Sequence, residues 1–231
     1  MSSPATLEHW RAPAAPGRVP MAGRFCRLEP LAAALHADAL HAANSVDAQG
    51  RMWDYMGYGP FVDRDAYRAW VEKCERSTDP LYFAIADAAS GAPGGVASYL
   101  RIDPPNGVIE VGHLAYSPRL QRTPAATEAM YLMMRHVFDL GYRRYEWKCN
   151  AQNASSRAAA QRLGFTFEGV FRQHMVVKGR NRDTAWFSIL DTEWPRIRQG
   201  FERWLDPANF DATGHQRRSL LECRTGRENE A

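Results

Sequence analysis

Cysteine is scarce in this sequence, and its spacing argues against a zinc site or a redox pair. The 231 residues contain four cysteines, Cys26, Cys74, Cys149 and Cys223. No two of them have the short spacing of a metal-binding or redox pair. We therefore expect free thiols in a reducing compartment, and no metal cofactor.

Long apolar runs are also missing. No stretch approaches the roughly 18 consecutive apolar residues of a membrane span. The N-terminus contains Glu8, Trp10 and several prolines instead of the apolar segment of a signal peptide. We therefore expect a cytoplasmic protein without a membrane partner.

A strong excess of one charge is absent as well. The net charge is +3, and no basic stripe of the kind that binds nucleic acid is present. Lys178, Arg180 and Arg182 form the densest basic cluster, but Gly179 and Asn181 lie among them. This composition is typical of a solvated hairpin tip, so we expect no nucleic-acid partner.

The remaining composition fits one globular domain with two flanking segments. Hydrophobic residues make up 45% of the chain and charged residues 24%, enough for a single substantial core. Residues 1–22 are rich in Ala and Pro and predict an extended N-terminal arm. Residues 23–205 form the expected domain and residues 206–231 a polar C-terminal tail, which we expect to be loose from His215 to Ala231.

Hydrophobic periodicity and turn residues predict an alternating α/β chain. Asp63 is an expected helix N-cap, and a strand–helix–strand crossing in mid-chain requires one parallel pair in an otherwise antiparallel sheet. The expected elements are strand 24–30, helices 31–43 and 63–74, strands 81–86, 94–102 and 108–116, helix 124–140, strand 145–149, helix 154–163, and hairpin strands 171–177 and 185–190.

The segment from Glu110 to Met130 joins a strand to a long helix through a short loop. Thr123 fits the helix N-cap and Pro124 the first helical position, where its missing N–H costs little. First-turn N–H groups have no partner inside the helix and attract phosphate where side chains are small. An ordinary capped helix packed on the sheet is the alternative.

A second segment follows the next strand. It reads Asn150-Ala-Gln-Asn153-Ala-Ser-Ser156-Arg157 and continues to Arg162-Leu-Gly-Phe165. Taken alone, Asn153 and Ser156 can serve only the helix end, as a cap and a first-turn residue.

Together the two segments resemble the GNAT superfamily of N-acetyltransferases. There the pattern Gln/Arg-x-x-Gly-x-Gly/Ala binds the diphosphate of CoA, and here it reads Gln121-Arg-Thr-Pro-Ala-Ala126. The family's Asn-x-x-Ser is present at 153–156. The resemblance spans residues 24–200 and is nearest to the ribosomal-protein N-terminal acetyltransferases of the Rim type (RimJ/RimL-like). It implies an α/β (α+β) fold with a central, mixed, mostly antiparallel twisted sheet and helices on both faces.

The resemblance implies direct transfer of acetyl from acetyl-CoA to a primary amine, on a protein N-terminus or a small molecule. Pro124 replaces a glycine and offers no N–H to phosphate, but donors at 122, 123, 125 and 126 remain. The expected acetyl-CoA-binding residues are Leu114, Ala115, Tyr116, Gln121, Arg122, Thr123, Pro124, Ala125, Ala126, Thr127, Asn153 and Ser156.

Amine acetylation needs a base for the amine and an acid for the leaving sulfur. The Rim-type comparison places Ser156 as the acid and Glu168 as a base. Glu110, on the strand before the loop, is a second candidate base. Either carboxylate can instead be a structural ion-pair partner. His113 and His174 as bases and Tyr116 as acid are weaker candidates.

The stretch Arg51–Val62 is aromatic and interrupted by glycines. Trp53, Tyr55 and Tyr58 are expected to shape a cleft for the acceptor. A hydrophobic loop packed over the core explains the same composition equally well.

Other functions fit parts of the pattern. The acceptor can be a small amine, such as an antibiotic, polyamine or amino acid; a cleft lined with carboxylates would favour a polycation, and an open groove a peptide. A non-catalytic acyl-CoA-binding regulator of the same fold is a second alternative. An unrelated α/β binding module, whose helix starts are only caps, is a third. Many relatives are dimers, and no feature of the sequence decides whether this chain is a homodimer.

Overall fold

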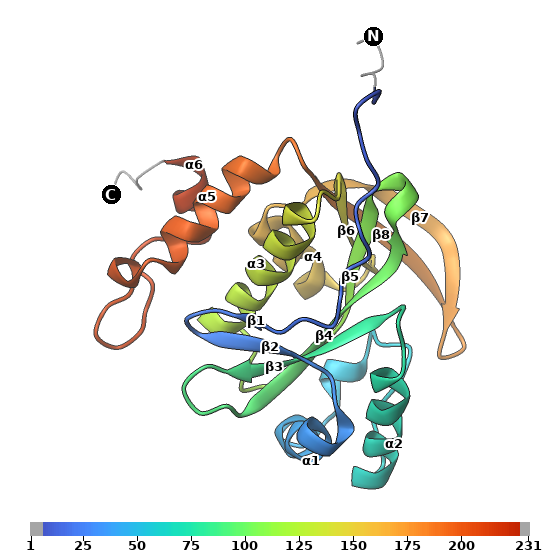
Figure 1. The fold of residues 1–231 in the computed structure, drawn as a ribbon. Helices are drawn as coiled ribbons and strands as arrows, with labels where there is room; N and C mark the ends of the chain where they lie inside the picture. The colour runs from blue at the N-terminus through green and yellow to red at the C-terminus, as the bar shows by residue number, and fades with distance from the viewer. Residues whose placement is uncertain (1–6, 227–231) are drawn as a thin grey trace.

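Strand β3, Leu81–Asp87, is buried from its first to its sixth residue. A strand that is apolar on both faces needs cover on both sides. Phe83 and Ile85 belong to the larger core, under helix α3 (Pro124–Asp139), while Tyr82 and Ala84 belong to a second core, under α1 (Ala33–Asn44) and α2 (Arg64–Glu75). The computed structural model, which describes residues 7–226, thus has a sheet between two helical layers (Figure 1).

The remaining elements follow the expected order. Asp63 caps α2 by accepting the N–H of Ala66 at 2.8 Å, as predicted. The hairpin strands begin five residues earlier than expected, at Thr166 and Arg180, because their first residues are paired through the backbone without a regular apolar alternation. The bounds are β1 Met21–Ala22, β2 Cys26–Pro30, η1 Arg51–Trp53, β4 Pro93–Asp103, η2 Pro104–Asn106, β5 Val108–Tyr116, β6 Arg144–Asn150, α4 Ala154–Leu163, β7 Thr166–Val177, β8 Arg180–Leu190, α5 Trp194–Leu205, η3 Pro207–Asn209 and α6 Leu220–Thr225.

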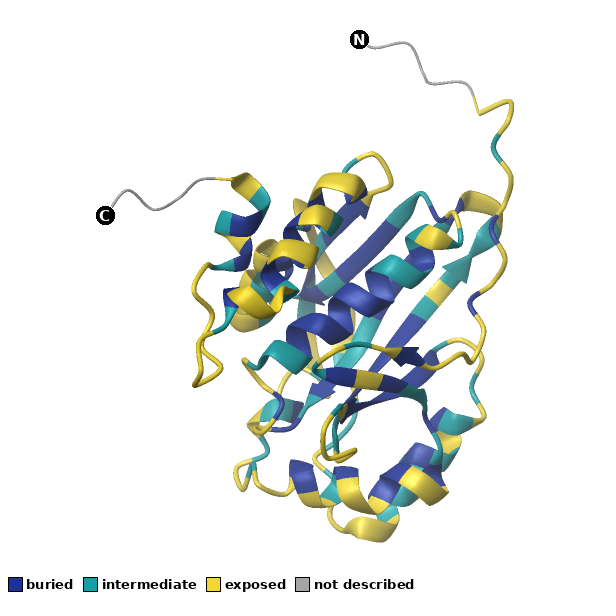
Figure 2. Ribbon diagram, turned by 60° about the vertical axis from the view of Figure 1, so that its left-hand side comes forward, coloured by how far each residue is buried: buried dark blue, intermediate teal, exposed yellow. Residues whose placement is uncertain are grey.

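One sheet contains all eight strands in the order β1-β2-β3-β4-β5-β6-β8-β7. β5 and β6 are parallel, and every other neighbouring pair is antiparallel. Helix α3 makes the crossover between the parallel strands, and most of its residues are buried against the sheet (Figure 2). The predicted fold class is therefore confirmed.

A buried carboxylate ties the N-terminal strands to α3. Glu128 accepts the backbone N–H groups of Arg24, Phe25 and Cys26 at 2.8, 2.6 and 2.9 Å. These bonds fix the turn between β1 and β2 against the second turn of α3. A Cβ atom at Gly23 would overlap the same carboxylate, so this turn also needs glycine.

Both flanking segments pack on the domain. The N-terminal arm, described from residue 7, ends in β1, which pairs with β2. The expectation of a loose tail from His215 is wrong for the part up to residue 226, because Leu220 and Cys223 of α6 are buried. Residues 227–231 lie outside the described part. The domain boundaries themselves stay a prediction.

The four cysteines are free and buried. No helix within residues 7–226 is long and apolar enough to cross a membrane.

Candidate active site

Strands β5 and β6 stop pairing halfway along their length. Their register runs from Val108 opposite Arg144 to Val111 opposite Trp147, although both strands continue for several residues. The register of β5 with β4 shifts at the same level, and His113 has a φ of +51°. Such a bulge bends a strand and increases its twist, so residues 112–116 diverge from β6 and leave a gap in the sheet.

The start of α3 lies at the end of this diverging strand. Thr123 caps the helix by accepting the Ala126 N–H at 3.2 Å, and the Thr127 N–H bonds to the Thr123 carbonyl at 3.3 Å. The Thr123 N–H makes a long bond, 3.4 Å, to the Leu120 carbonyl. Within residues 7–226, only the N–H groups of Arg122 and Ala125 in this turn have no acceptor. Of the four N–H groups expected to be free for phosphate, only these two are unpaired.

Side chains around the turn keep it open and positive. Gln121 folds back and donates to the Tyr116 carbonyl at 2.8 Å. Arg162 of α4 donates to the Thr127 hydroxyl at 2.6 Å, which joins the two sequence segments in space. Ala125 adds only a methyl group. Two unpaired amides at a helix start, a small side chain and nearby guanidinium groups suit a phosphate.

Ser156 lies in the first turn of α4, where Asn153 caps the helix by accepting its N–H at 3.0 Å. The indole of Trp147 donates to the Ser156 hydroxyl at 3.0 Å. Because the oxygen accepts this bond, the hydroxyl proton is available for donation. Burial raises the pKa of the nearby Cys149 thiol, and the Ser156 hydroxyl opposes that shift. Ser156 therefore stands beside β6 where the gap opens.

Glu110 lies on the other face of the sheet. Its register partner on β4 is Leu100 and on β6 is Glu146, next to Trp147, whose ring packs in the larger core with α3 and α4. Oε1 of Glu110 points along the strand, since a Cβ at Gly112 would lie 3.7 Å from it. We call this side of β5, β6, β7 and β8 the acceptor face. Glu110 and Ser156 thus lie on opposite sides of the sheet.

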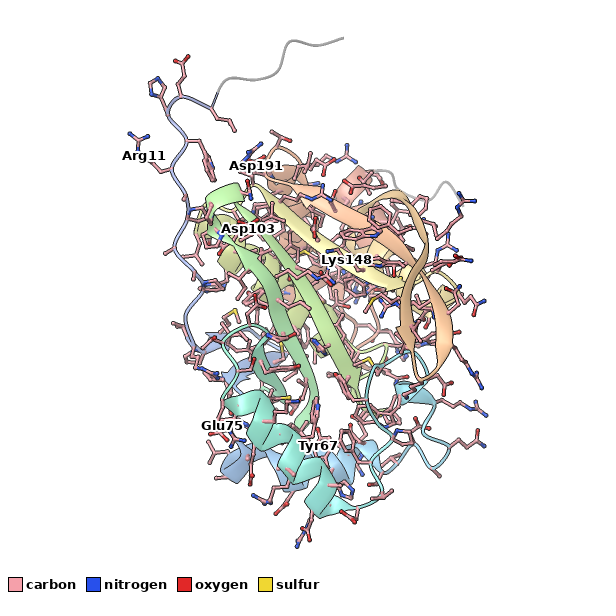
Figure 3. All side chains as sticks on the ribbon, turned by 90° about the vertical axis from the view of Figure 1, so that its right-hand side faces the viewer. Arg11, Tyr67, Glu75, Asp103, Lys148 and Asp191 are labelled. Atoms are coloured by element: carbon pink, nitrogen blue, oxygen red, sulfur yellow. The ribbon has the colours of Figure 1, made fainter. Side chains whose placement is uncertain are left out.

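A chain of ion pairs crosses the acceptor face. Lys148 Nζ lies 2.9 Å from both Glu110 and Glu146, and Arg101 lies 3.4 Å from Glu110. Burial raises the pKa of Glu110, and Lys148 opposes that shift. Figure 3 shows Lys148 on the sheet face turned away from α3.

Glu168 ends this chain. Arg144 donates to both of its carboxylate oxygens, and the Ser188 hydroxyl donates to it at 2.6 Å. Arg144 also bonds to Glu146 at 2.7 Å. The hydrogen bonds from Arg144 are the main cause that lowers the pKa of Glu168, so this carboxylate holds a proton poorly.

The aromatic loop mostly packs on the second core. Trp53 is 4% exposed and contacts Tyr58 and Phe61. Tyr58 reaches β5, where its hydroxyl lies 3.2 Å from Nδ1 of His113 and the two rings stack. Burial lowers the pKa of His113 to about 4, which makes it a weak base. Tyr55 is exposed, and its hydroxyl donates to the Gln152 carbonyl at 3.3 Å.

The strand residues next to the gap point into both cores. Leu114 and Tyr116 pack on the larger core and Ala115 on the second. The Tyr116 hydroxyl is shielded from solvent, and burial raises its pKa. Tyr116 is therefore poorly placed as an acid, while the backbone of 112–116 forms the edge of the gap.

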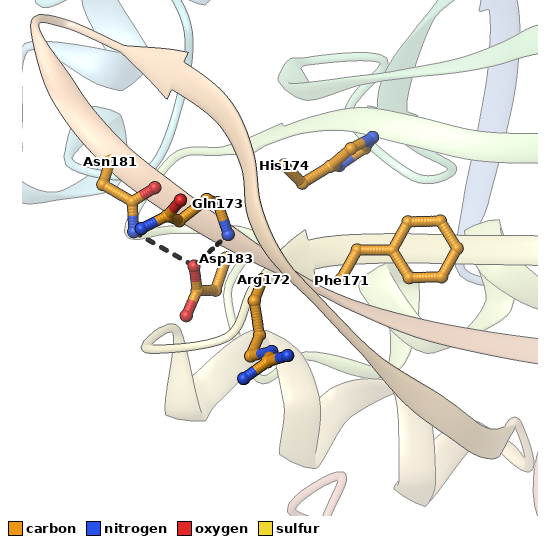
Figure 4. A pocket seen from close by; sticks show the side chains of 6 residues that line it. All are labelled: Phe171, Arg172, Gln173, His174, Asn181 and Asp183. Carbon is orange, nitrogen blue, oxygen red and sulfur yellow. Dashed lines mark hydrogen bonds between the residues drawn. The ribbon is translucent and has the colours of Figure 1, made fainter.

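The β7–β8 hairpin adds an open hollow of about 910 Å³. A bulge on β7 gives Gln173 a φ of +49°, and Asp183 accepts its N–H at 2.7 Å and the Asn181 amide at 3.0 Å (Figure 4). Phe171 and His174 point together to one side of the hairpin in this view. Phe171 contacts Trp186, and His174 bonds to Thr184 at 2.9 Å, so these side chains border the acceptor face.

Lys148 and Arg182 were missed from the sequence as site residues. The signal for Lys148 was present: Glu146 and Lys148 alternate with apolar residues on a strand expected in the sheet interior. Charges on one face of such a strand need partners or a ligand. Arg182 was predicted at a solvated hairpin tip, but it is half-buried and lies on the strand.

Known proteins share this architecture. A crystal structure of a GCN5-related N-acetyltransferase from Brucella melitensis is 51% identical, with a TM-score of 0.92, over 94% of this chain and 99% of that one. A probable GNAT-family acetyltransferase from Chromobacterium violaceum is 40% identical, with a TM-score of 0.79, over 84% and 98% of the two chains. No curated protein matches the sequence.

The Rim-type branch has weaker support. A putative ribosomal-protein-serine acetyltransferase from Vibrio cholerae is 15% identical, with a TM-score of 0.63, over 74% of this chain and 97% of that one, and such a likeness shows the fold alone. The family model of the GNAT acetyltransferase domain matches residues 26–166, more than half of the sequence. This chain therefore belongs to the GNAT acetyltransferase family, whose members transfer acetyl groups from acetyl-CoA.

Proposed function

We propose that this protein is an N-acetyltransferase that moves acetyl from acetyl-CoA to a primary amine. The observation that carries the proposal is the gap between β5 and β6. It begins after Val111 and Trp147, where the pairing of the two strands ends, and the Trp147 indole bonds to Ser156 at this point. A thioester entering from one face would meet an amine arriving from the other.

The residues present suit CoA. The diphosphate would be held by the N–H groups of Arg122 and Ala125, with the cationic side chain of Arg122 beside them. Pro124 costs only the donor that a glycine would add, because a first-turn proline leaves helix geometry intact. The backbone edge of residues 112–116 would hold the pantetheine arm. Its unpaired N–H groups would also donate to the oxygen of the reacting thioester carbonyl. Bound acetyl-CoA supplies the acetyl group as a thioester.

Two protons must move during the exchange of a C–S bond for a C–N bond. We assign removal of the amine proton to Glu110, whose carboxylate points along β5 toward the gap. A raised pKa makes it a stronger base than an exposed glutamate. We assign delivery of a proton to the leaving sulfur to Ser156, whose oxygen already accepts the Trp147 N–H.

Glu168 has a structural role in this proposal. Arg144 and Ser188 occupy its oxygens, so it holds β7 against β6 and β8. Asn153 serves as the cap that sets the orientation of Ser156. Trp53 supports the loop from inside, and Tyr55 and Tyr58 remain the proposed acceptor-side aromatics.

A coupled free-thiol assay tests the proposal. CoA release from acetyl-CoA should require an added primary amine and should produce the N-acetyl product, detected by mass spectrometry. Tight CoA binding with no thiol release across peptides and small amines would support the non-catalytic regulator instead. No CoA binding by calorimetry would support a binding module of another kind. A homodimer and a cytoplasmic location also stay predictions.

A further inference from the structure

The three glutamates in the ion-pair chain of the acceptor face are all paired with cationic side chains. Each carboxylate contacts at least one cation at 3.4 Å or less. A polycationic acceptor would find no unpaired carboxylate here among the residues described. The pairs form one alternating chain: Arg101, Glu110, Lys148, Glu146, Arg144 and Glu168.

Arg182 is a cation that does not belong to this chain of pairs. It is half-buried on β8, and none of its guanidinium nitrogens has an acceptor in the described part of the chain. Nε is fully shielded from solvent, so the outer end of the guanidinium is its accessible part. It lies two residues before Thr184, which pairs with Asn150 of β6, the strand that carries Lys148. A half-buried guanidinium favours a carboxylate, which it binds through two parallel bonds.

Trp186 provides a second unused donor on the same strand. Its indole N–H is buried and has no acceptor among residues 7–226. Residues 182 and 186 are four apart on β8, so both side chains leave the same face of the strand. The Trp186 ring lies 3.6 Å from Lys148 Nζ and 4.7 Å from the Phe171 ring. The acceptor face therefore offers two unused N–H donor groups near one candidate base.

We propose that the acceptor is a small amine that also carries a carboxylate, the class of amino acids and their derivatives. Its carboxylate would bind Arg182, near the Trp186 N–H, while its amine faces Glu110. This inference rests on the proposed function and narrows its substrate.

Matched acceptors test the proposal directly. Amino acids and their carboxamides share the amine and differ only in the carboxylate, for example β-alanine and β-alaninamide or glycine and glycinamide. In each pair, kcat/KM measured by thiol release should be about 10- to 100-fold higher for the acid than for the amide. This ratio corresponds to the contribution of a hydrogen bond between charged groups. Arg182→Gln should abolish that preference by raising KM for the acids, with little change for the amides, and Arg182→Lys should restore part of it.

Arg180→Gln is the matched control, because it removes the same charge from an exposed position on the same strand. It should keep the preference, and unchanged CoA affinity will show that both variants fold. Equal use of acids and amides by the wild-type enzyme would overturn the inference alone. An equal loss for acids and amides in Arg182→Gln would overturn it too, since Arg182 would then act on the reacting atoms. Absence of thiol release with every amine would overturn the proposed function, and this inference with it.

Discussion

Lys148 Nζ lies 2.9 Å from Oε2 of Glu110, and the two side chains are only 5% and 7% exposed. Burial raises the pKa of Glu110, while Lys148 and then Arg101 oppose the shift and Glu146 adds to it. The carboxylate is thus held between desolvation, which favours the proton, and its cations, which favour the charge. A general base near the sheet gap needs such a balance.

The pH dependence of kcat/KM should carry the signature of Glu110. A base must be ionised, and a raised pKa keeps the proton on to a higher pH. Activity should therefore fall with decreasing pH through a midpoint above 4.5, the ordinary value for a glutamate. Glu110→Gln should lower kcat/KM by about 10²- to 10⁴-fold, the usual range for a general base, and remove this acidic limb.

Glu168→Gln is the comparison for that experiment. Its carboxylate has a lowered pKa and is bonded to Arg144. The variant should keep the acidic limb of the wild-type profile. If Glu110→Gln keeps the acidic limb and Glu168→Gln loses it, Glu168 is the general base instead of Glu110.

Ser156→Ala should lower kcat by at least about 10²-fold while leaving CoA affinity nearly unchanged, because it removes a proton donor and little binding surface. Steady-state kinetics and calorimetry separate the two effects. Ser155→Ala is the matched control, since Ser155 is exposed in the same helical turn and its hydroxyl donates to the cap Asn153. Similar kinetics of the two variants would contradict the role of Ser156.

Ala125→Glu should abolish measurable CoA binding in calorimetry. The new carboxylate would stand at the proposed diphosphate site, where it adds both bulk and like charge. Ala158→Glu places the same side chain on an exposed position of α4 and should bind CoA as the wild type does. Unchanged affinity in Ala125→Glu would exclude this turn as the diphosphate site.

Glu128→Gln should lower the free energy of unfolding by about 2–3 kcal/mol, because one oxygen that accepts backbone N–H groups becomes a donor that opposes them. Urea unfolding followed by circular dichroism measures the loss. Asp38→Asn removes only a surface pair, with Arg68 at 2.8 Å, and should cost less than about 1 kcal/mol. Equal stability of Glu128→Gln and wild type would show that the β1–β2 turn does not depend on this carboxylate.

Local chemistry made much of the fold predictable. Thr123, Asn153 and Asp63 are helix caps in the structure as in the sequence, because capping involves only neighbouring residues. The parallel pair followed from the order of strands and helices. The C-terminal helices were missed because their stability comes from tertiary burial of residues such as Phe201 and Leu220, among many charged neighbours.

The site was predictable only where the resemblance supplied a motif. The proposed phosphate-binding turn and Ser156 were selected in this way, and their roles stay predictions. The bulge at His113 was not predictable, since a positive φ at histidine leaves no mark in the sequence. Arg182 was predicted at a solvated tip because its neighbours in the sequence are polar. Its partial burial on β8 depends on how the hairpin curves over the sheet, which the sequence does not show.

A crystal structure with CoA bound tests the central claim most directly. The account predicts diphosphate oxygens within about 3 Å of the backbone nitrogens of Arg122 and Ala125, and the sulfur in the gap between β5 and β6 beside Ser156. A diphosphate held on any other surface, or a sulfur remote from that gap, would contradict it.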